Sequence, residues 1–458
     1  MKKYLLTAML FAATFATAQT TSVDSIFIKK IADTIFASQD ARTNLYHLTK
    51  KIGARLAGSK GMYVAEIWGK KTLQNLGADS VYLQQCMVPH WVRGGTDKLT
   101  VSIDGGKPEP LQVIALGNSA GAGRQGVKAN VVMVKNLDEL NTLGNAVKGK
   151  IVYVDSRFDD KLVHTFQAYS KAGGVRRNAA STAAKYGAVG VLIHSLSHGD
   201  NNFAHTGMMA YDSAYPKIPA AALGNWDADI LRDHLTKNKK IEAQLFTHGY
   251  FLPDTIAHNV IAVLKGSDHP EKIITVGGHL DSWDNCEGAH DDGAGIIQTM
   301  EVLRSFVALG YKPKHTIRFV LFANEENGLR GGNKYADEAK EKNEQHVFAL
   351  ESDAGGFTPR GFGFTVTNDQ FNKLSSYKNL LSPYGGDVFA RGGGGSDIGP
   401  LNRHFKTPLA GLQPDSQRYF DYHHAANDVF ESVNIRELQL GAINMAALIY
   451  LVDKYGVE

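Results

Sequence analysis

The second half of the chain, after Pro253, alternates short apolar runs with longer stretches of helical period. The short runs predict buried strands, because they are too short to form core helices. Strands that alternate with helices build a mostly parallel sheet covered on both faces. We therefore expect an α/β fold whose mixed, mostly parallel sheet is flanked by helices. The expected strands span residues 273–277, 316–323 and 346–352, and the expected helices span about residues 293–309 and 434–454.

The stretch between residues 98 and 249 has a different pattern, in which short apolar runs are broken by glycines. This pattern predicts a compact, mostly β insertion with one helix at Val175–Tyr186. The insertion divides the larger domain into residues 19–97 and 250–458. The sequence therefore predicts two domains, one inserted into the other.

The first 18 residues have the order of a targeting segment. Two lysines precede the apolar run Tyr4–Phe15, and small residues up to Ala18 follow it. The apolar run is too short to span a bilayer, so residues 1–18 predict a secretory signal peptide. We expect a secreted or periplasmic protein that begins at Gln19 and keeps no stable membrane anchor; a retained anchor is the alternative.

Charge and cysteine content argue against two classes of protein. The 49 Lys and Arg residues nearly balance the 46 Asp and Glu residues, which gives 458 residues a formal net charge of +3. So small a net charge, without a basic run interleaved with aromatic residues, argues against nucleic-acid binding. The two cysteines, Cys86 and Cys286, are too few for a disulfide framework, and whether they pair stays open.

Acidic residues and histidines follow each expected strand of the second half. The carboxyl ends of parallel strands meet at one edge of a sheet, where active sites form. Carboxylates that lie close together repel one another, and divalent cations relieve that repulsion. Mixed imidazole and carboxylate ligands suit zinc, and a shared carboxylate holds two metals about 3.5–4 Å apart. The candidates are His279 and Asp281 after the first strand, His290, Asp291 and Asp292 before the helix, Glu325 and Glu326 after the second strand, Asp353 after the third, and His423, His424 and Asp428 in a later loop.

The order of these residues resembles metallopeptidase family 28, whose members are co-catalytic di-zinc exopeptidases. The resemblance implies a phosphorylase/hydrolase-like fold, peptide hydrolysis with two zinc ions, and homodimerisation. Part of the insertion resembles a protease-associated domain, and two segments outside it resemble one carboxypeptidase branch of the family. The matching segments are Gly277–Asp284 and Gly288–Gly295 for the family, Val88–Gly94 and Tyr419–His424 for the branch, and Val147–Val154 and Lys185–Val191 for the insertion.

The resemblance also implies which side chains hold the metals. The bridging acid is implied to be Asp291 and not Asp292, because the family's bridge stands four residues before a glycine. The last ligand is implied to be His424 and not His423, because the family's histidine stands four residues before an acid. The implied ligand sets are His279, Asp291 and Asp353 for one zinc, and Asp291, Glu326 and His424 for the other.

Further roles follow from the same resemblance. Asp281 is implied to orient His279 through a hydrogen bond. Glu325 is implied to be the general base, which takes a proton from the attacking water and passes it to the leaving amine. Tyr422 is the expected donor to the oxyanion, and Tyr419 is the second candidate for that role and an expected substrate-binding residue.

Two arginines and three histidines complete the candidate residues. Arg391, which opens a glycine-rich stretch, is expected to pair with a free substrate carboxylate, with Arg93 as the alternative. His194, His198 and His205 of the insertion lack a matching pair of carboxylates, so we expect them to be solvated loop residues.

We therefore expect an exported di-zinc exopeptidase whose partner is a short peptide, above all a dipeptide. One alternative is acyl transfer of the glutaminyl-cyclase type, which uses a related fold with one zinc. The other is a catalytically inactive, receptor-like binding protein on the same scaffold. The full ligand set argues against both alternatives, and the recognised peptide terminus and side-chain specificity stay open.

Overall fold

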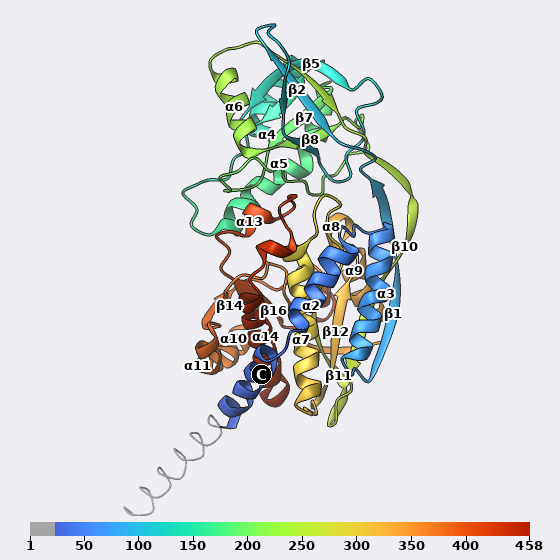
Figure 1. Cartoon of the computed structure of the whole chain (residues 1–458), viewed down its shortest axis with the longest axis vertical. Helices are drawn as coiled ribbons and strands as arrows, with labels where there is room; N and C mark the ends of the chain where they lie inside the picture. Colours follow the sequence, from blue (N-terminus) through green and yellow to red (C-terminus); the bar gives the residue numbers. More distant parts are fainter. Residues whose placement is uncertain (1–22) are drawn as a thin grey trace, which may run out of the picture.

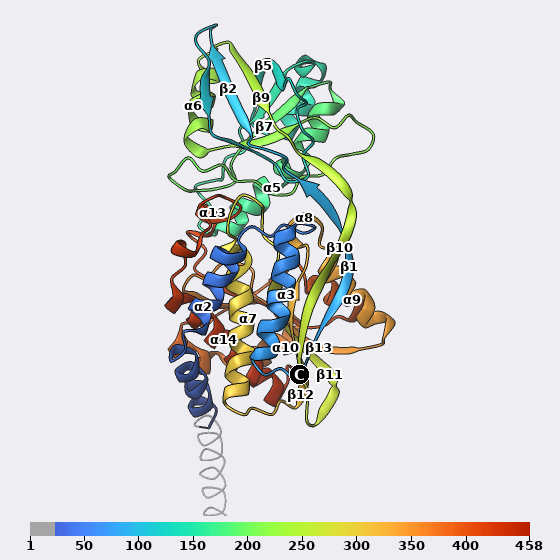
Figure 2. The same cartoon turned by 45° about the vertical axis from the view of Figure 1, so that its right-hand side comes forward.

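The computed structural model describes residues 23–458, so the expected signal peptide lies outside the described residues. These described residues form two eight-stranded sheets. Figure 1 shows them at opposite ends of the long axis of the molecule. One antiparallel ribbon, formed by β1 (Ser80–Val92) and β10 (Tyr250–Leu264), runs from the first sheet toward the second, as Figure 2 shows.

The first sheet is mixed. Its strands lie in the order β1, β10, β12 (His315–Phe322), β11 (His269–His279), β13 (Gln345–Glu351), β16 (Leu409–Pro414), β14 (Pro359–Thr365) and β15 (Val388–Arg391). The four central strands, β12, β11, β13 and β16, are parallel to one another. On both sides of this centre an antiparallel pair follows, β10 with β12 and β14 with β16. The expected mixed α/β fold is confirmed, and the three expected strands are β11, β12 and β13.

Helices cover both faces of the first sheet. Successive residues of β10 alternate between the faces, so Val260 and Ala262 join the larger core while Ile261 joins the smaller one. The larger core packs against α2 (Asp40–Tyr46), α3 (Lys60–Asn75), α7 (Ala294–Ala308), α10 (Asn368–Ser375), α11 (Lys378–Leu381) and α14 (Ile435–Tyr455), and the smaller core packs against α9 (Arg330–Glu341) and α12 (Gly399–Phe405).

The last helix, α14, is a core helix. It is long and apolar enough to cross a membrane, but 78% of its most apolar window is buried inside the fold. A helix that is apolar on all sides needs such burial. The side chain of Asn434 caps its start by accepting hydrogen bonds from the backbone amides of Arg436 and Glu437. Helices α7 and α14 confirm the two helices expected from the sequence.

The second sheet is built from the insertion, and it is also covered on both faces. Its strands lie in the order β3 (Glu109–Leu111), β2 (Lys98–Ile103), β9 (Ile241–Phe246), β5 (Val127–Val134), β6 (Ile151–Val154), β7 (Gly190–His194), β8 (Ala220–Leu223) and β4 (Val113–Ala115). The helices on one face are α4 (Leu137–Leu143) and α5 (Thr165–Lys185), and α6 (Asn225–Thr236) lies on the other. The expectation of a mostly β insertion is therefore wrong, because helices α4, α5 and α6 cover both faces of its sheet. The buried face of α5 is mostly alanine, whose weak periodic signal concealed the start of the helix before Val175.

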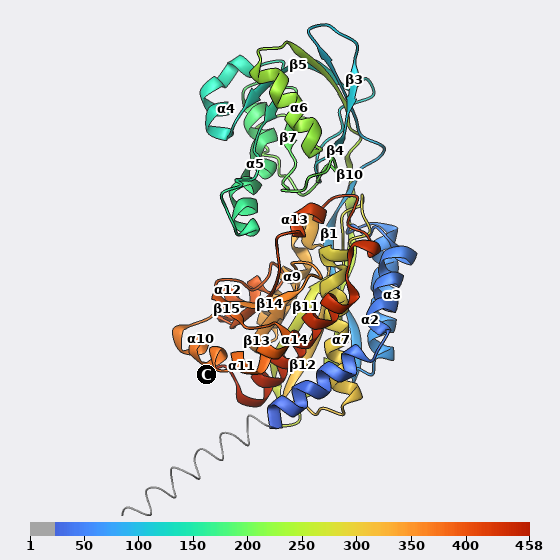
Figure 3. The same cartoon turned by 60° about the vertical axis from the view of Figure 1, so that its left-hand side comes forward.

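The carboxyl ends of the parallel strands point toward the insertion. Figure 3 shows α13 (Tyr419–Tyr422) between the first sheet and α5. The other short helical segments are η1 (His47–Ile52), η2 (Gly144–Val147), η3 (Ala289–Gly293), α8 (Glu325–Gly328), η4 (Ser382–Tyr384) and η5 (Phe430–Ser432).

Candidate metal centre

The expected ligands come from separate loops and meet at this edge of the first sheet. His279 ends β11, and Asp291 lies in η3 just before α7. Glu326 lies in α8 directly after β12, Asp353 follows β13, and His424 follows α13. Because β11, β12 and β13 are parallel neighbours, their carboxyl ends bring these side chains together.

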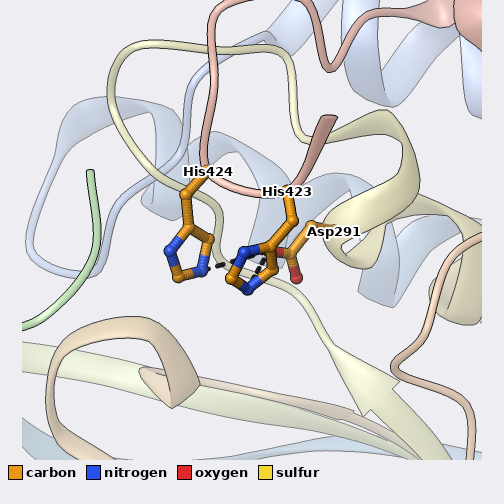
Figure 4. A group of neighbouring side chains, drawn as sticks. All are labelled: Asp291, His423 and His424. Carbon is orange, nitrogen blue, oxygen red and sulfur yellow. Dashed lines mark ion pairs between the residues drawn. The ribbon is translucent and has the colours of Figure 1, made fainter. Parts of the chain in front are cut away.

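Asp291 lies at the centre of the group. Its Oδ1 is 3.2 Å from Nε2 of His279, and its Oδ2 is 3.2 Å from Nε2 of His424. Figure 4 shows the imidazoles of His423 and His424 turned toward this carboxylate. The two oxygens of one buried aspartate therefore face two different histidines, as a carboxylate that bridges two cations would.

Each of these histidines meets a second carboxylate. Nε2 of His279 lies 3.4 Å from Oδ1 of Asp353, and Nε2 of His424 lies 3.0 Å from Oε2 of Glu326. The structure thus places the five side chains in two sets that share Asp291. These contacts are consistent with the two sets that the resemblance implies. The ligand atoms within 4.8 Å of one another also include those of His423 with Asp291 and His424, and of Asp292 with His279 and Asp353, so the assignment of the ligands stays a prediction.

Two neighbouring residues are alternatives to members of these sets. Nε2 of His423 lies 3.7 Å from Oδ2 of Asp291, and its ring stacks on that of His424 with centroids 3.5 Å apart. Asp292 instead accepts hydrogen bonds from the backbone amides of His279 at 3.0 Å and Gly295 at 2.9 Å. The contacts favour Asp291 over Asp292, because the Asp292 oxygens already have backbone partners.

The donor set fits zinc. Oδ2 of Asp291 and Oε1 of Glu326 are buried and have no hydrogen-bond partner among residues 23–458. Burial, and then the charge of Asp291, raises the pKa of Glu326 to about 7, so this group of carboxylates lacks compensating charge. Although burial opposes it, the charge of Asp353 raises the pKa of His279 well above its usual range. Imidazoles and carboxylates that crowd one another in this way are suited to a shared cation.

Two buried aspartates hold the loops that carry the ligands. Nδ1 of His279 lies 3.0 Å from the backbone carbonyl of Asp281, whereas the nearest carboxylate oxygen of Asp281 is 3.7 Å away. That carboxylate accepts hydrogen bonds from the backbone amides of Glu325 at 3.0 Å and Glu326 at 3.3 Å. Asp428 accepts from the backbone amide of Asp291 at 3.1 Å in the same way. Asp281 therefore lies beside His279 as expected, and its carboxylate mainly holds the Glu325–Glu326 turn.

Arg55 is a positioning residue that the sequence analysis missed. Its fully buried guanidinium donates to the backbone carbonyls of Glu287 at 2.6 Å and Gly288 at 2.8 Å, and also to that of Leu280. These carbonyls belong to the loop between His279 and Asp291. No sequence signal marks such a residue, because its partners are backbone atoms that any residue type supplies.

Glu325, Tyr419 and Tyr422 have different surroundings near the candidate ligands. Burial raises the pKa of Glu325 to about 8, and the neighbouring charge of Asp353 adds to the shift. Tyr419 is buried with its ring 5.1 Å from that of His423, and burial, followed by the charge of Asp291, raises its pKa well above the usual range. The half-buried ring of Tyr422 instead packs 5.3 Å from that of His290. Tyr419 therefore lies beside the loop that carries His424, whereas Tyr422 packs against His290.

Neither arginine expected to bind substrate contacts the ligand cluster. Arg93 donates two hydrogen bonds to Asp284, at 2.6 and 2.8 Å, and contacts Asp97 at 3.2 Å. The guanidinium of Arg391 lies over the ring of Phe371, 4.5 Å from its centroid. In the described chain both side chains are engaged elsewhere.

The insertion forms one wall of the centre. Nη1 of Arg176, from α5, lies 3.4 Å from Nδ1 of His424, and the carbonyl of Thr206 lies 3.3 Å from the same nitrogen. Nδ1 of His205 donates to the carbonyl of His423 at 2.7 Å. His205 is buried in this contact, so the expectation that it is a solvated loop residue is wrong.

His194 is also buried, while His198 is partly exposed. The expectation of solvated loop residues is therefore wrong for His194 as well as for His205. His194 is the last residue of β7, a strand that is buried along its whole length, and His205 lies in a later segment that turns inward to the ligand loop.

Comparison with known proteins agrees with this geometry. Residues 259–449, which include all five candidate ligands, match the description "Peptidase family M28". The chain is 32% identical to carboxypeptidase Q of Mus musculus over 405 residues, which cover 88% of this chain and 84% of that protein. Carboxypeptidase Q of Homo sapiens is likewise 32% identical, with 88% and 83% covered.

Solved structures extend the match to the whole fold. The crystal structure of a peptidase M28 precursor from Shewanella amazonensis has a TM-score of 0.89 and 33% identity, covering 94% of this chain and 97% of that one. A zinc aminopeptidase from Bacillus subtilis shares the fold with a TM-score of 0.63 at 21% identity, covering 90% and 94%. The chain belongs to peptidase family M28.

Proposed function

We propose that this protein is a di-zinc exopeptidase that hydrolyses dipeptides or other short peptides. The observation that carries the proposal is Asp291, whose two oxygens face His279 and His424, each beside a further carboxylate. His279, Asp291 and Asp353 would hold one zinc, and Asp291, Glu326 and His424 would hold the other. When bound, such ions lower the pKa of a shared water to about 7 and polarise the scissile carbonyl.

Glu325 moves the proton in this proposal. Its backbone amide is held by Asp281, and it directly precedes the candidate ligand Glu326, so its carboxyl is placed at the edge of the centre where a carboxylate can take and release a proton. Glu325 accepts the proton of the attacking water and donates it to the leaving amine. Tyr419 supports the substrate beside the acids, and Tyr422 remains a predicted donor to the oxyanion.

Arg176 is the side chain that we propose for a free substrate carboxylate. When Nε2 of His424 holds a metal, Nδ1 carries the proton and donates to the carbonyl of Thr206, so it cannot accept from Arg176. Nε of Arg176 is buried without a hydrogen-bond partner among the described residues. Its Nη2 donates to the hydroxyl of Tyr169 at 2.6 Å, which leaves Nε and Nη1 as donors for a carboxylate. Arg176 also lies beside the candidate ligand His424, which neither Arg93 nor Arg391 does in the contacts of the described chain.

Contact of the insertion with the ligand loop supports short substrates. Arg176 and His205 of the insertion contact His424 and the backbone of His423, so the insertion limits the space beside the ligand loop. Export by a signal peptide, the protease-associated character of the insertion and homodimerisation stay predictions from the sequence. The single-zinc cyclase and the inactive binding protein are disfavoured by the two ligand sets that share Asp291.

One experiment tests the proposal. The purified protein is assayed with free, N-blocked and C-amidated dipeptides and with tripeptides, before and after a chelator, and its zinc content is measured. We expect two zinc ions per chain and hydrolysis that the chelator abolishes and zinc restores. Cyclisation of N-terminal glutamine with one zinc, or zinc without hydrolysis of any peptide, would contradict the proposal.

A further inference from the structure

A cavity lies in the insertion, away from the candidate metal centre. It has a volume of about 170 Å³ and lies between the start of α6, the end of β7 and the segment before α5. We call it the insertion cavity; its lining includes Asp160, His194, Asp200, Asn225, Trp226 and Asp229. This volume holds several water molecules or a small organic molecule.

Two buried acceptors in this lining have no donor. Nδ1 of His194 lies 2.7 Å from the carbonyl of Ser195, so Nδ1 carries the hydrogen and Nε2 has a free lone pair. The side chain of Asn225 donates from Nδ2 to the carbonyl of Gly199 at 2.7 Å. Nε2 of His194 and Oδ1 of Asn225 then have no hydrogen-bond partner among residues 23–458, although the two residues are only 2% and 6% exposed. A buried acceptor without a donor lowers the stability of the fold. A ligand that donates hydrogen bonds to Nε2 of His194 and Oδ1 of Asn225 would remove that cost.

The charges around the cavity are mostly negative. Asp160, Asp200 and Asp229 line it; Arg157 and Arg232 lie 3.5 and 2.9 Å from Asp229, so Asp160 and Asp200 supply the negative charge that these arginines do not compensate. Oδ1 of Asp229 lies 3.7 Å from Nε2 of His194, so a donor between them reaches both atoms. Trp226 is half exposed at the wall, where its indole offers a face that attracts cations. A positively charged donor suits this lining better than a neutral one.

A metal ion suits it less well. Among the described residues, the groups whose ligand atoms converge closely enough for a metal all belong to the candidate metal centre. From these contacts we propose that the insertion cavity binds the ammonium group of a small primary amine, such as a free amino acid or a simple alkylamine.

The cavity shares a wall with the segment that leads to the metal ligands. The ring of Phe158 in its lining packs 5.5 Å from that of Phe420 in α13, and 4.9 Å from that of His198. The chain continues from α13 directly into His423 and His424. If the proposed function holds, a free amino acid released by hydrolysis is a ligand of the right chemistry close to its source; this choice of source rests on the proposed function.

The test is a binding titration of the zinc-loaded protein, followed by calorimetry. The probes are methylamine, leucine and leucinamide, which carry an ammonium group, and N-acetyl-leucinamide, which does not. We expect saturable binding of the three amines and none of the acetylated probe. Stronger binding of leucine and leucinamide than of methylamine would identify an amino acid as the source, and equal binding would identify a simple amine.

Three variants locate the binding. His194→Phe and Asn225→Leu should weaken it roughly tenfold each, because each removes one buried acceptor. Asn178→Leu, at an exposed asparagine of α5, is the matched control and should bind as the parent does. Asp160→Ala changes a side chain that is 85% exposed, so it tests the charge without endangering the fold, and it should weaken binding less. Circular dichroism and the melting temperature establish that each variant is folded.

Amine binding that the cavity variants leave unchanged would overturn the proposal, as would equal binding of the acetylated probe or no saturable binding at all. A third zinc ion that His194→Phe removes would also overturn it, in favour of a metal. Zinc content and dipeptide hydrolysis are measured on the same samples. If the cavity does not bind amines but dipeptides are hydrolysed, the cavity proposal fails and the proposed function is unaffected. If the cavity binds amines but no peptide is hydrolysed, the proposed function fails and amine binding is unaffected.

Discussion

The carboxylate of Asp281 accepts a hydrogen bond from the backbone amide of Glu325 at 3.0 Å. It reaches the amide of Glu326 as well, while the carbonyl of Asp281 faces Nδ1 of His279. One residue therefore sets the position of a candidate ligand on β11 and of the proposed base after β12. A substitution that displaces Asp281 should therefore affect proton transfer and metal binding together.

Asp281→Asn should lower kcat about 10–100-fold and weaken zinc binding, because the amide side chain loses one of the two acceptors that hold the Glu325–Glu326 turn. Steady-state kinetics and zinc titration check both effects. Glu287→Gln is the control, since Glu287 lies in the same loop but its side chain pairs with Lys50. A parental kcat in Asp281→Asn would show that the two hydrogen bonds from the Glu325 and Glu326 amides to this carboxylate are not needed for turnover.

Glu325→Gln and Glu326→Gln should fail in different ways, although the residues are adjacent. Glu325→Gln removes the proton carrier, so turnover should fall at least a hundredfold while both zinc ions stay bound. Glu326→Gln removes a carboxylate that lies 3.0 Å from His424, so one zinc should be lost or weakened. Metal analysis beside a dipeptide assay separates the two results, and zinc loss in both variants would move Glu325 into the ligand set.

His424→Phe should lower the zinc content by about one ion per chain, whereas His423→Phe should retain both. Nε2 of His424 lies within 3.2 Å of two acids, and that of His423 lies 3.7 Å from one. Because the rings stack on each other, phenylalanine preserves the packing in either position. The opposite pattern of zinc loss would assign the ligand to His423.

The parts of the structure that could be predicted are those with local signals. The strands β11, β12 and β13 are short apolar runs followed by polar residues, and parallel pairing then brings His279, Glu326 and Asp353 to one edge. That inference needs only the pattern along the chain and the geometry of parallel sheets. The loops that carry the candidate ligands could therefore be predicted, whereas the choice of Asp291 over Asp292 and of His424 over His423 rests on the family resemblance and stays a prediction.

The parts that could not be predicted depend on contacts between distant segments. Arg55 binds backbone carbonyls, which leave no trace in residue types. Arg176 and His205 reach the centre only because the β1–β10 ribbon sets the insertion against the first sheet. The sequence pattern predicts an exposed His205 and gives no reason to include Arg176 in the site. Both positions depend on how the insertion packs against the first sheet, which periodicity along the chain does not encode.

The stability of the metal-free protein should fall as pH rises from about 7 to about 9. Burial raises the pKa of Glu326 to about 7 and that of Glu325 to about 8; although burial opposes it, Glu326 raises the pKa of His424 to about 10. The folded state therefore binds more protons than the unfolded state in this range, and the stability that these protons contribute is lost as pH rises through the folded pKa values. His205, whose pKa burial lowers to about 4, changes the balance only below its usual value of 6.5.

Zinc should remove this dependence, because bound cations replace the protons as compensating charge. The gain in melting temperature on adding zinc should accordingly grow between about pH 7 and 9. Thermal unfolding of chelated and zinc-loaded samples measures it. A gain that stays constant with pH would mean that the buried acids do not share the metal.

Arg176→Met should raise KM for dipeptides with a free carboxyl terminus about tenfold or more and leave kcat little changed, since a lost charge-assisted hydrogen bond is worth about 1.5–3 kcal/mol. C-amidated dipeptides should show no such change, because they lack the carboxylate. Arg177→Met is the matched control: Arg177 is the exposed neighbour of Arg176 on α5. Arg391→Ala should behave as that control does, because its guanidinium lies over Phe371. Equal losses for free and amidated substrates would mean that Arg176 acts on His424 and the fold of the centre, whereas a selective loss in Arg391→Ala would return the carboxylate to the glycine-rich loop.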